Sequence, residues 1–131
     1  MELRRRWDLI GDDCVRRDAD LAFAILWTYN GVGIDLTGHV LELKIRLADG
    51  SGNALLTIDN AANGGITLAD QSIVLTDPRN PNQRGGAFYR ITQAQIAALA
   101  PGRYSYTTRD LTGGGITSMW LGFIEFAGPT S

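Results

Sequence analysis

Cysteine, histidine and lysine each occur only once in this chain of 131 residues. The lone cysteine, Cys14, excludes a disulfide bond within the chain, so a folded domain must be held together by its core. His39 is the only imidazole that could activate this thiol, and no motif links the two residues. We therefore interpret Cys14 as a buried or incidental thiol rather than as a nucleophile.

Long apolar runs are also absent. The longest candidate, residues 21–27, is far shorter than the ~18 apolar residues that a membrane-spanning helix needs. The first residues are basic and then acidic, without the apolar segment of a secretory signal. We expect the protein to be made and folded in the cytoplasm and to have no membrane partner.

An excess of basic charge is missing as well. The formal net charge is −2 and the pI is near 5.2, which argues against a general affinity for nucleic acid or anionic membranes. The one basic run is Arg4, Arg5 and Arg6. It either contacts an acidic partner or a phosphate group, or forms a solvated strand end, and it is shorter than the tracts that mark nucleic-acid binding.

Short apolar segments separated by glycine dominate what is present. The chain has 16 glycines and 44% hydrophobic residues, and its length suits one domain. Residues 40–49, VLELKIRLAD, contain the cleanest alternation of apolar and polar residues in the chain, over 41–47, which predicts a half-buried strand. The turn at 49–53 and a return strand at 54–59 complete a predicted hairpin.

Further strands are predicted on both sides of this hairpin. The apolar run at 20–29 is typical of a central strand, although its pattern alone also fits a helix. Residues 77–86, with two prolines and two asparagines, are typical of an exposed loop. Thr92 and Gln95 have the spacing of a capping box that begins a helical turn. The remaining predicted strands are 3–10, 65–69, 72–76, 87–91, 103–110 and 116–126.

The segment that ends the helical turn indicates the architecture. Pro101 and Gly102 stop the turn, and a strand carrying Tyr104 and Tyr106 follows at once. This order predicts a tyrosine corner, in which the hydroxyl of Tyr104 bonds to upstream backbone while Tyr106 packs behind it. We predict an all-β, immunoglobulin-like antiparallel β-sandwich of about seven to nine strands with one short helical turn. Residues 1–131 would form a single domain, with extended residues 1–6 and a tail at 127–131.

No set of residues predicts catalysis. Asp12 and Asp13 head an acidic cluster that could bind calcium, but the cluster lacks the twelve-residue loop pattern and contains two arginines. The glycines at 113–115 are not followed by the residues of a phosphate-binding loop. We predict no enzyme activity, no catalytic residue, no cofactor and no metal. The three tryptophans (Trp7, Trp27 and Trp120) could form a sugar-stacking platform or, as is more common on sandwich strands, core or interface contacts.

Four features together resemble small tail-associated structural domains of bacteriophages, in the style of the upper-baseplate-protein N-terminal domain and Ig-like fibre-attachment domains. The first is an opening strand before Gly11-Asp12-Asp13, and the second is Ile34-Asp35-Leu36-Thr37-Gly38 ahead of the strand VLELKIR. The third is Ile66-Thr67-Leu68 followed by Ile73-Val74-Leu75. The fourth is Leu99-Ala100-Pro101-Gly102-Arg103-Tyr104 ahead of a glycine-rich hairpin and the strand LGFIEF. The resemblance covers nearly the whole chain, which ends soon after the sandwich without a fibre shaft.

This resemblance implies a non-enzymatic structural protein of a virion, in the tail, baseplate or fibre adaptor. We expect it to be made in the host cytoplasm and to contact other virion proteins as a homo-oligomer, either a trimer or a ring. The candidate contact residues are Arg4, Arg5, Arg6, Arg79 and Arg84. A capsid decoration or head–tail connection protein and a carbohydrate-binding module are the alternatives, and a glycan is the less favoured partner.

Overall fold

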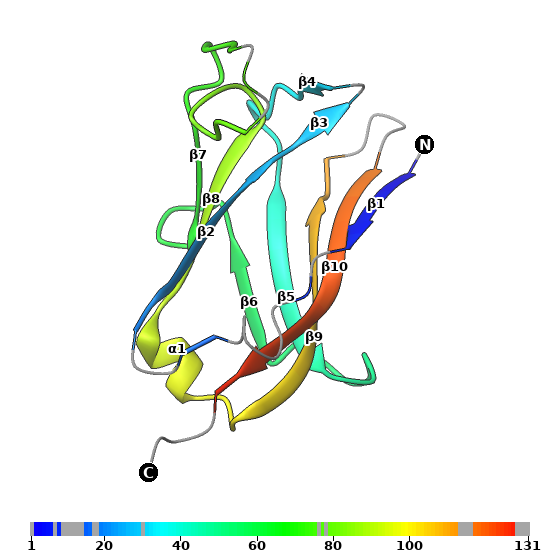
Figure 1. Cartoon of the computed structure of the whole chain (residues 1–131), viewed down its shortest axis with the longest axis vertical. Helices are drawn as coiled ribbons and strands as arrows, with labels where there is room; N and C mark the ends of the chain where they lie inside the picture. Colours follow the sequence, from blue (N-terminus) through cyan, green and yellow to red (C-terminus); the bar gives the residue numbers. More distant parts are fainter. Residues whose placement is uncertain are drawn as a thin grey trace.

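Two β-sheets face each other in the computed structural model, and one short helix closes one end of the molecule (Figure 1). The residues that the structure describes are 2–6, 8, 15–16, 19–29, 31–75, 77, 79–112 and 117–127, with only the backbone described at 2–6, 29 and 117–120. None of the helices in this part of the chain is long and apolar enough to cross a membrane.

The larger sheet has five strands in the order β1, β10, β9, β5, β6. Their bounds are Glu2–Arg6, Thr117–Phe126, Gly102–Asp110, Leu41–Leu47 and Leu56–Asp59. Neighbouring strands are antiparallel except for β1, which runs parallel to β10.

The smaller sheet has three antiparallel strands in the order β2, β8, β7, with bounds Leu21–Leu26, Gly86–Ile91 and Ile66–Leu68. A ribbon of β3 (Thr28–Tyr29) and β4 (Val32–Gly33) extends one end, and α1 (Gln93–Ala97) lies at the other (Figure 1). This arrangement matches the B, E and D strands opposite the C, F and G strands of an immunoglobulin-like sandwich.

The strand β5 forms because its alternating sequence places apolar side chains on one face. Leu41, Leu43 and Ile45 are buried, while Glu42 and Lys44 between them are partly exposed on the outer face. The strand pairs with β6 on one side and β9 on the other, so it lies inside the larger sheet. The predicted hairpin is confirmed, with its return strand shortened to β6.

A layer of apolar side chains fills the space between the sheets. Its largest fully buried members are Trp27, Leu36, Leu41, Leu43, Ile45, Ile58, Tyr89, Ile91, Ile96 and Phe126.

A chain of hydrogen bonds crosses this apolar layer. The indole Nε1 of Trp27 donates to the hydroxyl of Tyr89 at 3.2 Å. That hydroxyl lies 3.2 Å from Oγ1 of Thr108, which donates to the carbonyl of Glu42 at 2.9 Å. The chain joins β8 of one sheet to β9 and β5 of the other. Burial raises the pKa of Tyr89 to about 12, so its hydroxyl keeps its proton over the usual pH range.

The helix and the corner after it have the local structure that their sequence predicts. Thr92 caps α1, and its side chain and that of Gln95 form the reciprocal bonds of a capping box. The hydroxyl of Tyr104 then donates to the carbonyl of Ala100 at 2.6 Å, across the bend that contains Pro101 and Gly102. The Tyr104 ring packs against Phe126, and Tyr106 is buried on the same face of β9.

The fold class is confirmed: the chain forms an all-β sandwich with one short helix. Ten strands occur in the described residues, two of them only two residues long. The predicted first strand, 3–10, is represented by β1, and the part at 9–10 lies outside the described residues.

The prediction of a central strand at 20–29 is wrong. Its main part, β2, lies at the border of the smaller sheet, and β8 lies in the centre. Ala22 and Ala24 are exposed, so the continuous apolar run hides an alternation of large inward and small outward side chains. Alanine is apolar in composition, but it does not require burial.

The predicted strand at 72–76 is also wrong over its described part, 72–75. These residues belong to the long connection between β7 and β8. Ile73, Val74 and Leu75 are exposed there rather than buried. β-branched residues therefore misled the prediction, because no neighbouring strand pairs with this segment among the described residues.

We predict that Tyr104→Phe lowers the free energy of unfolding by about 1 kcal/mol, because the substitution removes one hydrogen bond and leaves the Ala100 carbonyl without it. Chemical denaturation measures the change. Thr107→Ala on the outer face of β9 is the control and should change stability by less than about 0.5 kcal/mol. Equal stability of Tyr104→Phe and wild type would contradict a stabilising corner bond.

Candidate functional site

Three connections meet at the end of the sandwich opposite α1 (Figure 1). They are residues 27–40 between β2 and β5, residues 69–85 between β7 and β8, and the end of β9 with residues 111–112. We call this region the loop end. Loops at one end of a rigid sandwich commonly carry its binding function.

The side chain of Gln71 ties two of these connections together. Its Oε1 accepts from the amide of Leu36 at 2.9 Å and from the amide of Gly85 at 3.0 Å. Its Nε2 donates to the carbonyl of Ala69 at 2.8 Å. One side chain therefore satisfies main-chain groups from three places in the sequence. No pattern around Gln71 distinguishes it from a solvated loop residue.

Gln83 organises the connection at 69–85 from inside. It is only 4% exposed, and its Nε2 donates to the carbonyls of Asp77 and Asn80 at 2.7 and 2.9 Å. Its Oε1 accepts from the amide of Leu75 at 2.9 Å. The predicted loop is confirmed over the described residues of 77–85, but it is only partly exposed, because this buried amide replaces solvent for the loop backbone. The last residue of the predicted range 77–86, Gly86, begins β8.

Glycines allow the two connections to touch backbone to backbone. A Cβ at Gly85 would collide with the carbonyl of Trp27, and Gly85 has a positive φ of 92°. A Cβ at Gly33 would collide with the carbonyl of Arg84. Larger residues at these positions would push the connections apart.

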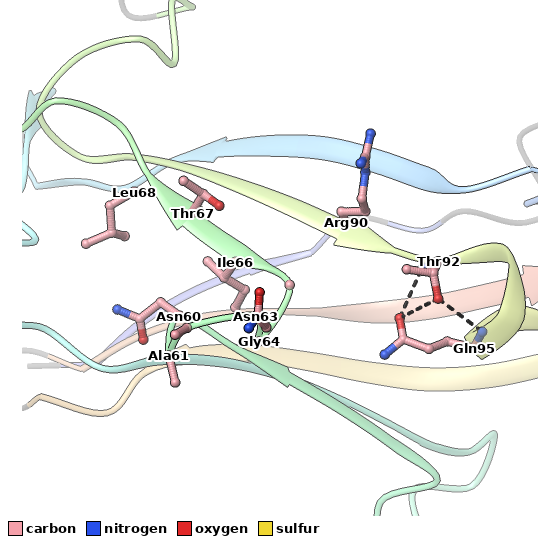
Figure 2. Close-up of a pocket in the computed structure, with 12 residues that line it drawn as sticks. Asn60, Ala61, Asn63, Gly64, Ile66, Thr67, Leu68, Arg90, Thr92 and Gln95 are labelled. Carbon is pink, nitrogen blue, oxygen red and sulfur yellow. Dashed lines mark hydrogen bonds between the residues drawn. The ribbon is translucent and has the colours of Figure 1, made fainter.

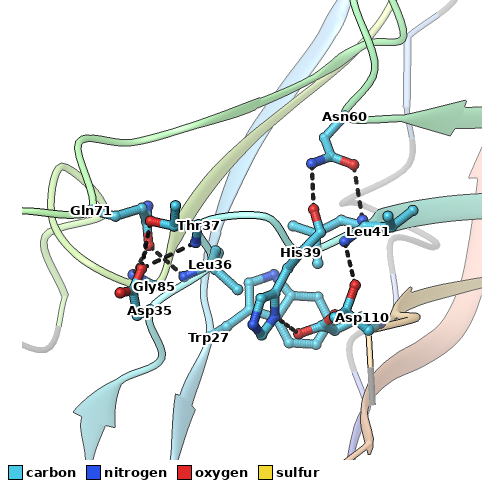
Figure 3. Close-up of polar contacts among 12 residues, drawn as sticks. Trp27, Asp35, Leu36, Thr37, His39, Leu41, Asn60, Gln71, Gly85 and Asp110 are labelled. Carbon is cyan, nitrogen blue, oxygen red and sulfur yellow. Dashed lines mark hydrogen bonds and ion pairs between the residues drawn. The ribbon is translucent and has the colours of Figure 1, made fainter. Parts of the chain in front are cut away.

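A histidine–aspartate pair joins the third connection to the start of β5. The Nδ1 of His39 lies 2.6 Å from Oδ2 of Asp110, whose side chain is largely buried (Figure 3). The other carboxylate oxygen of Asp110 accepts from the amide of Thr112, and the hydroxyl of Thr112 accepts from the amide of Val40. Sequence reasoning missed this pair because its members are far apart in the chain.

The His39–Asp110 pair does not form a catalytic triad among the described residues. No described hydroxyl or thiol is bonded to the other nitrogen of His39. The carbonyl of His39 accepts from the side chain of Asn60, whose Oδ1 accepts from the amide of Leu41. These bonds hold the start of β5 to the end of β9, so the pair has a structural role in the larger sheet. No group of three or more described His, Cys, Asp or Glu residues could hold a metal ion.

The loop end exposes apolar side chains on this fixed backbone. Val32 and Val74 are each 62% exposed, and the two neighbours of Val74 in the chain, Ile73 and Leu75, are 39% and 41% exposed. The carbonyl of Ile73 accepts from the amide of Arg84 at 2.6 Å, so the apolar segment is fastened to the strand end beside it. Exposed apolar groups of this kind mark interaction sites.

Two carboxylates, Asp35 and Asp70, lie in the same connections as these apolar groups. The hydroxyl and amide of Thr37 bond to Asp35 and lower the pKa of its carboxyl, with the hydroxyl making the larger contribution. Ser72 lowers the pKa of Asp70 in the same way. Both carboxylates therefore stay charged at neutral pH.

One hollow lies away from the loop end, between the 60–65 connection and α1 (Figure 2). Its volume is about 560 Å³. Its polar side chains already serve the fold: Thr92 and Gln95 bond to each other, and Asn60 holds the backbone of β5. We find no chemical group there that is positioned for a reaction.

The predicted contact residues have different environments. Arg79 is highly exposed and lies 3.5 Å from Asp77, as a surface ion pair. Arg84 is partly buried, and its Nε donates to the carbonyl of Gln71 at 2.9 Å, so it holds the loop. Arg4, Arg5 and Arg6 lie on β1, and their side chains are outside the described part of the structure.

Other residues singled out in the sequence do not gather at one site. Trp27 is 2% exposed and offers no surface to a sugar ring. Tyr104, Pro101 and Gly102 form the corner at the α1 end. The residues outside the described structure are Trp7, Asp12, Asp13, Cys14 and 113–115, together with the side chain of Trp120.

Compared with models of known protein families and with curated proteins, the sequence has no significant match. The candidate site therefore rests on the geometry of the loop end.

We predict that Gln71→Met destabilises the protein by about 2 kcal/mol, because the amides of Leu36 and Gly85 lose their acceptor. Hydrogen exchange at these two amides should accelerate, and denaturation measures the loss of stability. Gln93→Met on the exposed side of α1 is the matched control and should have little effect. Unchanged exchange at both amides would argue against Gln71 as the anchor.

Proposed function

We propose that this chain is a non-enzymatic assembly protein that binds its partners through the loop end. One observation carries the proposal: apolar side chains project from a loop backbone that is fixed by buried or partly buried amide side chains. A surface that is already ordered loses less conformational entropy on binding, and its apolar groups gain by leaving water.

The polar groups of the described structure support this proposal over a catalytic one. The His39–Asp110 pair and the chain through Tyr89 each bond main-chain or side-chain groups of the fold itself. Among the described residues, no nucleophile is bonded to the imidazole of His39 and no group of three metal-ligating side chains stands beside it, so these groups do not form a catalytic set. Binding is the function that remains for a sandwich of this composition.

The resemblance to phage tail domains supplies the proposed setting, a virion, with a tail, baseplate or fibre-adaptor position. The loop end would contact another virion protein there. The same contact would serve a capsid decoration or head–tail connection protein. Arg79 at the rim could pair with an acidic group of the partner, since its present ion pair with Asp77 is exposed and weak. A homo-oligomer, as a trimer or ring, belongs to the same proposal.

We predict that Val74→Asp removes the protein from virions while leaving it folded. The side chain is 62% exposed, so the fold tolerates the charge, but a charge at an apolar contact must be desolvated on binding. The measurement is quantitative mass spectrometry of purified particles from a host in which the altered gene replaces the original.

Leu55→Asp is the matched control. Leu55 is 48% exposed in the hairpin between β5 and β6, at the opposite end of the sandwich from the loop end. It should be incorporated at the wild-type level. Absence of the wild-type protein from particles would reject the virion setting, and normal incorporation of Val74→Asp would reject the loop end as the contact.

A further inference from the structure

The two sheets have four border strands: β1 and β6 in the larger sheet, β2 and β7 in the smaller. A border strand has main-chain N–H and C=O groups that can pair with a strand of another molecule. Natural proteins usually prevent such pairing with charges, short strands or proline. The four borders of this chain differ in these features.

Three of the borders carry such protection. The strand β1 contains Arg4, Arg5 and Arg6 in succession. The strand β6 has four residues and ends at Asp59. The strand β7 has only three residues. A second molecule would gain few hydrogen bonds at β6 or β7 and would have to accommodate three positive charges at β1.

The fourth border, β2, lacks every such feature. It has six residues, LAFAIL, without a charge, a proline or a glycine. Ala22 and Ala24 are exposed on its outer face, and the larger Leu26, on the same face at the end of the strand, is partly buried. The nearest charges are at its beginning, where Asp20 lies 3.7 Å from Arg90.

The register of β2 shows which of its main-chain groups are available. The amide of Trp27, just after β2, donates to the carbonyl of Gly85, just before β8, at 2.7 Å. Every second residue before it, Ile25, Phe23 and Leu21, therefore directs its main-chain groups to β8. In an antiparallel ladder the alternate residues direct their N–H and C=O groups to the other side. These residues are Ala22, Ala24 and Leu26, and no described residue bonds their main-chain groups.

We propose that β2 pairs with β2 of a second copy of this chain, antiparallel, about a two-fold axis at Ala24. Ala24 then lies opposite Ala24 of the second copy, and Ala22 lies opposite its Leu26. All three residues exchange both of their main-chain hydrogen bonds in this register. The two smaller sheets become one continuous sheet.

The side chains of β2 suit this register. At the axis two alanines face each other on the outer face, which leaves room for close approach. On the inner face Phe23 lies opposite Ile25 of the second copy, and an aromatic residue opposite a β-branched one is a favourable cross-strand pair. Asp20 lies opposite Thr28 of the second copy, so no like charges meet. The sequence is therefore self-complementary, as a two-fold interface requires.

This inference rests on the proposed assembly function and names one partner, a second copy. A two-fold contact makes a dimer. A ring or trimer would need a second, different contact. Only the first residues of the loop end, 27–28, lie in the paired segment, because β2 borders the side of the sandwich, so its exposed apolar side chains can bind another partner at the same time (Figure 1).

The experiment is sedimentation velocity on the full chain over a concentration series. Wild type should dimerise. Ala24→Lys alone and Ala24→Glu alone should each raise the dissociation constant of the dimer by about tenfold or more, because like charges then face each other at the axis. An equimolar mixture of the two variants should restore the dimer, since the charges are then opposite.

Thr67→Lys on the outer face of β7 is the control for the added charge, and it should dimerise like wild type. Thermal unfolding tests that every variant is folded, and dimerisation of the mixture independently excludes misfolding as the cause of dissociation. The proposal would be overturned by a monomeric wild type, by a dimer that Ala24→Lys does not weaken, or by a mixture of the two folded variants that does not dimerise. The Val74→Asp variant should still dimerise, so loss of the loop-end contact is distinguishable from loss of the β2 contact.

Discussion

The hydrogen bonds through the Tyr89 hydroxyl are the constraint on which the two layers depend. Tyr89 lies on β8, the central strand of the smaller sheet, and its hydroxyl contacts Trp27 beside it and Thr108 across the core. Because buried polar groups are costly when unpaired, the sheets cannot slide without breaking this chain. Burial keeps the hydroxyl protonated and able to donate. Phe23 stacks on the Tyr89 ring at 4.9 Å, so the border strand is held by the same residue.

The loop end follows from this fixed spacing. Trp27 begins the first connection, and its backbone bonds Gly85 at the end of the second and the amide of Ile34. Gln71 and Gln83 then satisfy the main-chain groups that a long connection would otherwise expose to water. A loop whose main-chain groups are hydrogen-bonded internally stays ordered even when it carries apolar side chains on its surface. The same bonding that stabilises the loops also prepares a contact surface.

The border of the smaller sheet and the loop end offer two kinds of contact. Pairing at β2 would use main-chain hydrogen bonds and a self-complementary register, whereas the loop end would use exposed apolar side chains. The first suits an identical partner, and the second suits a different one. Together they describe how a small sandwich could take a defined place in a larger assembly.

The sequence by itself determined the elements whose signals are local. The alternation in β5, the capping box of Thr92 and Gln95 and the bend before Tyr104 depend on residues within a few positions of each other, so the prediction and the structure agree. All-β architecture followed from the same short-range patterns. Tertiary structure alone decided which strand lies at a border, because Ala22 and Ala24 are apolar whether exposed or buried. It also decided the roles of Gln71, Gln83 and the His39–Asp110 pair, since an amide or carboxylate gains its structural role only when a distant backbone group is brought within hydrogen-bond distance.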